Sequence, residues 1–214
     1  FPKAVRRSKM SDQCIDASFQ LMVQSEGDAA SAFEGDLDDD ETTALMLGVR
    51  LLDAVASKLL SKDVYSRGMN AVQKLAGSSM PYQRAIAYRS MAIMVDGCRN
   101  EFTAQAKQLI SALSNAYKGD SEAQVRASAM RSIGALVENL EIYELDEKTL
   151  MEVREITLET SILGIKDPDI RVRKIACGSL EAAFTVYEDE EDIAPRVDDI
   201  TNVLSQAGIP EEAV

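Results

Sequence analysis

The chain has 214 residues, 46% of them hydrophobic, and its formal net charge is −13. A chain of this length can bury a substantial core, and its 5% aromatic content, with abundant alanine, leucine, methionine and serine, favours helices over strands. The acidic balance argues against nucleic-acid binding, and no apolar run of about 18 residues predicts a membrane span. Because the first residue is Phe1 rather than Met, we expect the chain to be part of a longer protein.

Apolar residues recur at helical spacing in successive segments. Residues 9–24 are predicted to form the first helix, and an acidic linker follows at about residues 26–41. The later segments, in chain order, are residues 42–59, 61–77, 82–97, 101–119, 123–139, 147–164, 170–185 and 193–207. The segments alternate between the first helix of a pair, called first-type below, and the second helix of a pair, called second-type. This alternation predicts about four and a half helical pairs.

Three of the second-type segments align on an arginine. Arg84, Arg126 and Arg173 are separated by 42 and 47 residues, and the segment 42–59 fits the same frame 40 residues earlier. Three alanines and three serines also fall in register behind the arginines: Ala87, Ala129 and Ala176, then Ser90, Ser132 and Ser179. Periods in this range are typical of stacked helical repeats. We therefore predict an all-α fold, an α-α superhelix in which residues 1–214 form a single array.

An aspartate precedes two of the aligned arginines by six residues. Asp120 precedes Arg126, and Asp167 precedes Arg173. Repeated in stacked units, such residues can bridge neighbouring repeats as a ladder of charge-assisted hydrogen bonds, which would also include Arg84.

The turns between paired helices carry further signals. Ser78 stands at the aspartate position of the second unit, and the first unit lacks both partners of the ladder. Asp167 is predicted to be an N-cap with Pro168 at the first helical position. Ser121 and Gln124 are predicted to form a capping box in the preceding unit.

Most of the net charge comes from two short stretches. Residues 34–41 contribute −6 and residues 188–199 contribute −6, together −12 of the total of −13. The acids of the first stretch are Glu34, Asp36, Asp38, Asp39, Asp40 and Glu41. Each stretch is either a solvated loop or an attractor of a basic partner. The first connects the helices of one pair and the second connects two pairs, so we expect them on opposite edges of the array.

Catalysis has little support in the sequence. There is no His for acid–base chemistry or for a Cys/His pair, and no glycine-rich phosphate loop with a following Lys. Cys14, Cys98 and Cys177 lie far apart in amphipathic segments, which favours buried, reduced thiols over a zinc site or a disulfide framework. The stretch "DLDDDETTALML" lacks the central Gly of a calcium-binding loop. We expect no enzyme activity, no cofactor and no bound metal.

The Asp and Arg spacing, followed by an Ala/Leu helix at a period near 40 residues, resembles the HEAT repeat. Three stretches carry a narrower resemblance: "DLDDDETTALMLGVRLLDAVASKL", "MPYQRAIAYRSMAIMVDGCRNEF" and "DSEAQVRASAMRSIGALVENLE". In order and spacing they are similar to successive repeats of the importin β superfamily, the karyopherins, over about residues 36–187. The first looks like that family's acidic insertion, and the second ends its helix in Gly97-Cys98. The match is nearest to the branch that imports ribosomal proteins and histones.

This resemblance implies a fragment of a nuclear import receptor. Such a protein binds basic cargo, here ribosomal proteins or histones, touches Phe-Gly nucleoporins and releases its cargo to Ran-GTP. It moves between cytoplasm and nucleus through the nuclear pore. A HEAT scaffold outside transport, such as a phosphatase, coat-adaptor or chromosome-organising subunit, is the alternative, because a fold does not fix a function.

The resemblance also implies where cargo would bind. In this family the second helix of each pair lines the inner surface. Packing Ala87, Met91 and Met94 inward would leave Arg89 and Asp96 on another face of the helix. The implied cargo-binding residues are Asp53, Arg89, Asp96, Arg131 and Glu138, together with the acids of residues 34–41. An ordinary solvated helix face is the alternative interpretation.

Overall fold

The computed structural model describes residues 10–25, 43–185 and 194–206. These residues form α-helices and short 3-10 helices and contain no strand, which confirms the all-α fold class. The first-type helices are α2 (Met10–Gln24), α5 (Ser61–Ala76), α8 (Ala106–Gly119), α10 (Glu147–Ile165) and α13 (Val197–Gln206). The second-type helices are α4 (Ala44–Lys58), α6 (Pro81–Met94), α9 (Ala123–Asn139) and α11 (Ile170–Thr185). A single array over residues 1–214 stays a prediction, because part of that range lies outside the described residues.

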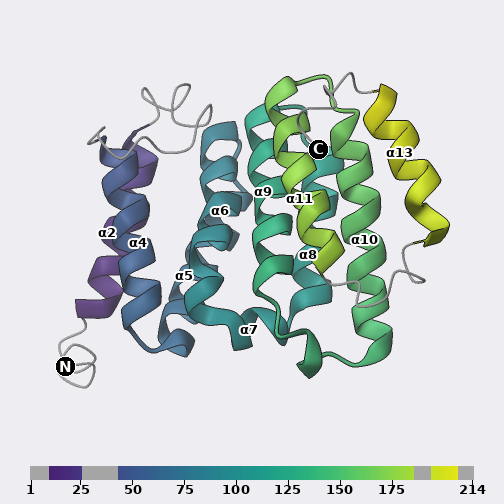
Figure 1. The fold of residues 1–214 in the computed structure, drawn as a ribbon. Coiled ribbons are helices and arrows are strands. Elements are labelled where there is room, and N and C mark those ends of the chain that lie inside the picture. Colours follow the sequence, from purple (N-terminus) through teal and green to yellow (C-terminus); the bar gives the residue numbers. More distant parts are fainter. Residues whose placement is uncertain (1–9, 26–42, 186–193, 207–214) are drawn as a thin grey trace.

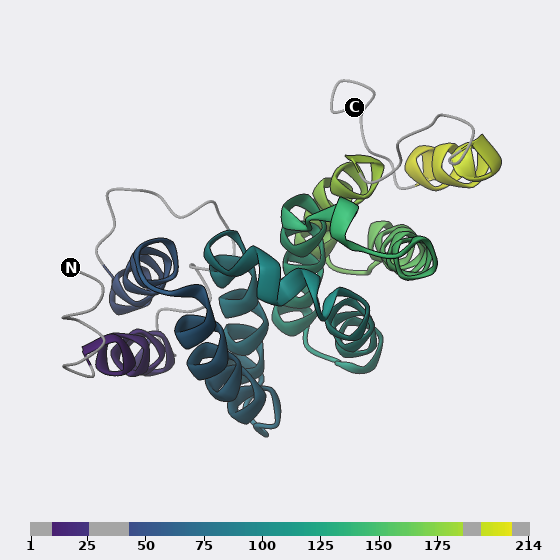
Figure 2. The ribbon, with the colours of Figure 1, turned by 90° about the horizontal axis from the view of Figure 1, so that it is seen from below.

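The helices form two rows (Figures 1 and 2). In one row α9 packs against both α6 and α11, and in the other α8 packs against α10. Turns within a pair lie at the upper edge of Figure 1, and connections between pairs lie at the lower edge. Viewed from below, the rows bend so that the second-type helices lie on the inner side (Figure 2). Neighbouring pairs are therefore stacked side by side in chain order.

The predicted helix 101–119 is interrupted in the structure. It begins as the short helix α7 (Arg99–Thr103) and resumes as α8 after Gln105, whose φ of −124° and ψ of 15° are not helical. Phe102 is completely buried and meets Tyr65 edge-on, with ring centroids 5.0 Å apart. The break lets Phe102 fill the space beneath α5 while α8 turns its own apolar face to the core, a change of direction that helical periodicity cannot reveal.

The predicted helix 82–97 also ends early. Met94 is its last α-helical residue, and the 3-10 helix η2 (Asp96–Cys98) follows. A Cβ on Gly97 would lie 2.2 Å from the carbonyl oxygen of Ala56. Cys98 is fully buried, and its Sγ donates to the carbonyl of Ser61 at 3.6 Å. The Gly-Cys pair therefore fixes the second unit against the end of α4.

The turn before α11 differs from the sequence prediction. The helix begins at Ile170, and Asp169 Oδ1 accepts from the backbone N–H of Arg171 at 2.9 Å. Asp169, rather than Asp167, is thus the residue that caps the helix, and Pro168 precedes it. Asp167 Oδ1 accepts from the N–H of Asp169 at 2.9 Å, so its second oxygen is available for other partners.

The predicted capping box in the preceding unit is also wrong. The N-cap of α9 is Glu122, with no side-chain capping bond. Asp120 Oδ1 instead accepts from the N–H of Glu122 at 3.0 Å. In both turns the aspartate orders the loop just before the helix, so Asp120 and Asp167 occupy equivalent positions.

We predict that Gly97→Ala destabilises the protein by about 3 kcal/mol, because its Cβ would overlap a backbone oxygen that cannot move away freely. Gly178→Ala is the matched control, since a Cβ there meets nothing within 4 Å. Gly178 lies inside α11, so the control is expected to stabilise by about 0.5–1 kcal/mol. Urea unfolding followed by circular dichroism measures both, and equal midpoints for the two variants would contradict the close contact.

Candidate functional site

Arginines of the second-type helices bond the aspartate of the following unit. Arg84 Nε donates to Asp120 Oδ2 at 2.7 Å, and its Nη2 donates to Oδ1 at 3.0 Å. The remaining nitrogen, Nη1, donates to the backbone carbonyls of Ser78 and Ser79, both at 3.1 Å. One guanidinium thus holds the turn of its own unit and the turn of the next, with the planar two-point geometry that arginine offers a carboxylate.

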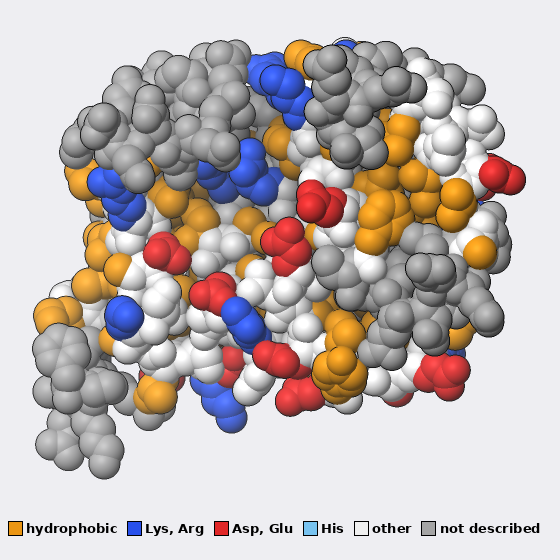
Figure 3. All heavy atoms as spheres, in the orientation of Figure 1, with side chains coloured by type: hydrophobic (Ala, Val, Ile, Leu, Met, Phe, Trp, Pro, Cys, Tyr) orange, Lys and Arg blue, Asp and Glu red, His pale blue; other side chains and the backbone are white. Residues whose placement is uncertain are grey.

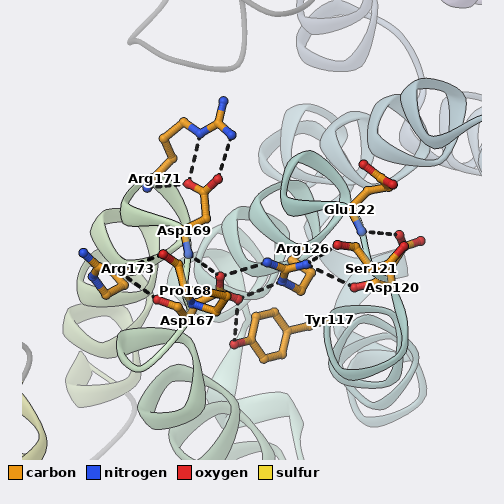
Figure 4. Close-up of polar contacts among 10 residues, drawn as sticks. All are labelled: Tyr117, Asp120, Ser121, Glu122, Arg126, Asp167, Pro168, Asp169, Arg171 and Arg173. Atoms are coloured by element: carbon orange, nitrogen blue, oxygen red, sulfur yellow. Dashed lines mark hydrogen bonds and ion pairs between the residues drawn. The ribbon is translucent and has the colours of Figure 1, made fainter.

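The next unit repeats this arrangement (Figure 4). Arg126 Nε and Nη2 donate to Asp167 at 2.8 and 2.9 Å, and Nη1 donates to the carbonyls of Asp120 and Ser121 at 3.3 and 2.7 Å. Tyr117 Oη adds a third donor to Asp167 at 3.2 Å. We call each arginine–aspartate contact between successive units a rung. The Asp167 side chain is only 2% exposed, so the rung at Asp167 is buried more deeply than the rung at Asp120, whose side chain is 13% exposed.

Arg173 makes half of the same pattern. Its Nη1 donates to the carbonyls of Asp167 and Pro168 at 2.9 and 3.2 Å. Among the residues that the structure describes, no carboxylate lies within ion-pair distance of it. In the second unit Ser78 Oγ donates to Gln83 Oε1 at 2.7 Å and accepts from the N–H of Met80 at 3.1 Å, so it acts within its own turn.

Hydrogen bonding keeps both ladder aspartates ionised. Burial by itself would raise their pKa values, but the bonds from Arg84 to Asp120 and from Arg126 to Asp167, with the backbone bonds, lower each pKa below its ordinary value of 3.8. The same contacts raise the pKa of both guanidinium groups. The pKa of each aspartate falls and the pKa of each arginine rises, as expected for a pair in which each charge stabilises the other.

A second periodic contact was not foreseen from the sequence. Ser132 Oγ donates to the carbonyl of Tyr88, and Ser179 Oγ donates to the carbonyl of Met130 at 2.9 Å. Tyr88 and Met130 are equivalent residues of successive units, 42 positions apart. The sequence signal for this contact was the alignment of the two serines in successive units, on helix faces that are otherwise apolar. The contact joins α6 to α9 and α9 to α11 where the helices touch.

The inner helix face differs from the sequence prediction at one residue. Ala87, Met91 and Met94 are buried as expected, but Arg89 is only 7% exposed and does not project into solvent. Burial and the nearby charge of Arg131 lower the pKa of Arg89 to about 10. Tight packing of α6 against α9 leaves little room between these equivalent positions, so Arg89 cannot serve as a freely exposed cargo contact.

The other candidates on this face are accessible. Asp53 on α4 and Glu138 on α9 are exposed, and Arg131 is half-buried. Asp96 is exposed and forms an ion pair with Arg99, so its charge is partly neutralised. Figure 3 shows this face of the molecule, with acidic and basic side chains interspersed among apolar ones. Glu34, Asp36, Asp38, Asp39, Asp40 and Glu41 lie outside the described residues, as do residues 188–192.

A cleft of about 440 Å³ lies on the other row of helices, between α10 and α13. Its apolar lining comes from Ile162, Leu163 and Val203. Leu163 is 45% exposed although it is a large apolar side chain. Arg196 Nη2 bonds Glu155 Oε2 at 2.6 Å and helps to hold the start of α13 against α10.

The described residues show no group of His, Cys, Asp and Glu side chains arranged to hold a metal ion. All three cysteines are free thiols; Cys98 is buried, while Cys14 and Cys177 are half-buried. Burial raises the pKa of Cys98 to about 12, so this thiol is not poised as a nucleophile. Within the same residues, none of the helices combines the length and apolarity needed to cross a bilayer.

No protein-family model matches this sequence, and no curated protein is significantly similar to it.

Arg126→Ala is predicted to destabilise the protein by about 3 kcal/mol, because it leaves the buried Asp167 carboxylate without its guanidinium. Arg173→Ala is the matched control, since it removes only bonds to two backbone carbonyls and should cost about 1 kcal/mol. Chemical denaturation of the three proteins measures the difference. Equal losses for both variants would show that the ion pair adds nothing to the backbone bonds.

The ladder should also make stability depend on acid. A carboxyl whose folded pKa is lowered contributes stability that is present above its unfolded value of 3.8 and is lost as the pH falls through the folded value. We therefore expect the unfolding free energies of the wild-type protein and the Asp120→Asn, Asp167→Asn double variant to differ most at pH values well above 3.8, and the difference to shrink as the pH falls below 3.8. Denaturation curves across this pH range test it, and a constant difference would rule out titration of these two groups.

Proposed function

We propose that this chain is part of a nuclear import receptor of the importin β superfamily and that it binds basic protein cargo. The observation that carries the proposal is the acidic stretch of residues 34–41 inside a helical pair, together with the Gly97-Cys98 unit, both of which resemble the family. The repeated rung, Arg84 to Asp120 and Arg126 to Asp167, supports the stacked array in which they stand. Proteins that carry extended cargo need a long surface whose units keep a fixed spacing. A rung that joins neighbouring turns supports such spacing, and Arg84, Asp120 and Arg126 lie in the stretches whose sequence resembles the family.

The negative net charge of the chain supports binding to a basic protein partner. The net charge of −13 favours association with a positively charged protein, and the acids of residues 34–41 concentrate nearly half of it in the connection between α2 and α4. Ribosomal proteins and histones carry lysine-rich segments of the required sign. Attraction of this kind raises the rate of encounter more than it raises affinity, so the inner face must supply the remaining contacts.

The inner face offers side chains suited to an extended peptide. Asp53 and Glu138 can bind lysine or arginine side chains of the cargo, and Arg131 can bond its backbone carbonyls. Asp96 would contribute less, because Arg99 already pairs with it. Exposed ion pairs are worth at most about 1 kcal/mol each, so we propose that binding is spread over several units.

Pore passage requires contact with the phenylalanines of Phe-Gly nucleoporins. The cleft between α10 and α13 suits this role, because its lining includes Ile162, Leu163 and Val203 and it lies on the row opposite the inner face. Its other lining residues are polar or charged: Glu159, Lys166, Arg196, Asp199 and Asn202. An aromatic ring placed there would bury apolar surface that now faces water. Release of cargo to Ran-GTP, and movement between cytoplasm and nucleus, belong to the same proposal for the full-length receptor.

A HEAT scaffold outside transport, such as a phosphatase, coat-adaptor or chromosome-organising subunit, is the competing function. Such a scaffold shares the stacked pairs and the rungs, so these cannot separate the two. The full-length protein bound to a histone or ribosomal-protein segment should lose that cargo when Ran-GTP is added, and should keep it with Ran-GDP. Retention with both nucleotide forms would favour the scaffold.

Replacing the six acids of residues 34–41 by their amides should slow association with a lysine-rich histone peptide about tenfold at low salt and flatten the salt dependence. The control removes six exposed acids elsewhere, so that the net charge changes equally. These are Asp12, Glu122, Glu144, Glu147, Glu159 and Glu181. Stopped-flow on-rates compare the variants; equal slowing in both would mean that total charge, rather than the acidic stretch, steers the peptide.

A further inference from the structure

Tyr143 is unusually exposed for a tyrosine. It is 89% exposed in the short helix η3 (Ile142–Glu144), which connects the third pair to the fourth. Tyr82 and Tyr117 are 3% and 7% exposed, and Tyr65 and Tyr88 are half-buried. Within the described part of the chain, the Tyr143 hydroxyl makes no hydrogen bond. Its ring and hydroxyl are therefore presented to solvent without a packing role.

The residues on either side are anchored, so the exposure is a property of this one side chain. Leu140 is 8% exposed, and Ile142 and Leu145 pack against the core. The N–H of Glu141 donates to Thr103 Oγ1 at 3.1 Å. Only two backbone bonds close the turn itself, from Glu144 N to the Glu141 carbonyl at 2.8 Å and from Leu145 N to the Ile142 carbonyl at 3.1 Å. Access for an enzyme therefore depends on the exposure of the Tyr143 side chain itself, since Ile142 and Leu145 keep the turn packed against the core.

The flanking sequence is acidic, although Arg99 lies near Glu141 and Lys107 lines the same hollow as Glu144 and Asp146. Five acids lie in the window 138–147, which contains neither Lys nor Arg: Glu138, Glu141, Glu144, Asp146 and Glu147. All five are exposed or half-buried. A segment of this kind complements an enzyme whose substrate groove is basic and is repelled by an acidic one.

We propose that Tyr143 is a phosphorylation site for a protein-tyrosine kinase with a basic substrate groove. Tyr143 Oη attacks the γ-phosphorus of Mg-ATP, and the bond from that phosphorus to the β–γ bridging oxygen breaks. The hydroxyl proton passes to the catalytic carboxylate of the kinase, and the products are phosphotyrosine and ADP. The kinase and ATP supply everything that the chain lacks for this step.

The modification would add a charge of about −1.5 to −2 at the edge between the third and fourth pairs. Tyr143 belongs to a connection between pairs, whereas the rungs at Asp120 and Asp167 belong to turns within pairs, at the opposite edge (Figure 1). The phosphate therefore leaves the stack intact and converts a neutral edge side chain into a dianion that an arginine-bearing reader domain can bind. This inference does not depend on the proposed transport function.

The test uses the intact chain carrying Tyr187→Phe, because Tyr187, which lies outside the described residues, also precedes several acids. A purified acid-directed protein-tyrosine kinase domain with Mg-ATP should add one phosphoryl group, located on Tyr143 by peptide mass spectrometry. Adding Tyr143→Phe should abolish incorporation. Glu141→Gln with Glu144→Gln should slow it at least threefold, and the phosphorylated chain should keep its melting temperature.

A free peptide covering residues 136–149 is the control for the flanking charges. Phosphate on the peptide but not on the folded chain would overturn the proposal, because the turn would then shield the hydroxyl. Incorporation at another tyrosine, or into neither substrate, would overturn it as well.

Discussion

The contact between a guanidinium and the carboxylate of the next unit is the interaction on which the described structure depends. Arg126 bonds Asp167 through two parallel hydrogen bonds and bonds two carbonyls of its own turn. Because one side chain spans two turns, the rotation of one pair relative to the next is restricted as well as their separation. Apolar packing alone is less directional. The serine bonds from Ser132 and Ser179 to the neighbouring helix act along the same interface.

Much of the fold could be predicted from the sequence, because apolar spacing identifies helices when each has one buried face. The limits of α5 and α10 agree with the prediction within one residue. The break between α7 and α8 could not be predicted, since both parts keep apolar residues at helical spacing and only the burial of Phe102 explains the change of direction. The capping role of Asp169 was missed because Asp167 also precedes the helix and has the same side chain.

Some residues of the candidate site could be predicted from the sequence and others could not, because residue spacing identifies equivalent positions but does not give burial or bonding partners. A six-residue spacing from aspartate to arginine in the third and fourth units indicated the ladder residues, although the ion pairs run between units. Arg89 was placed wrongly because periodicity assigns a side chain to a face, whereas its burial depends on how closely α6 and α9 approach. The serine contacts were visible only as aligned residues. A hydroxyl on an apolar face is equally compatible with a bond to its own helix, as Ser90 makes with Ile86 at 2.8 Å.

The joint between the first two pairs is of a different kind. An arginine–aspartate pair joins them too, but it is exposed and lies between first-type helices: Arg67 on α5 donates to both carboxylate oxygens of Asp16 on α2. Tyr82 Oη also donates to the Met22 carbonyl at 2.6 Å, and the Gly97 backbone lies against Ala56. Arg173, at the other end, offers its guanidinium to whatever follows α11. Adding a repeat behind the fourth pair by protein engineering thus calls for an aspartate at its turn, whereas a graft ahead of the second pair calls for a matching apolar surface against Gly97 and a carboxylate on its first helix for Arg67. The two ends of the described array are not interchangeable as attachment points.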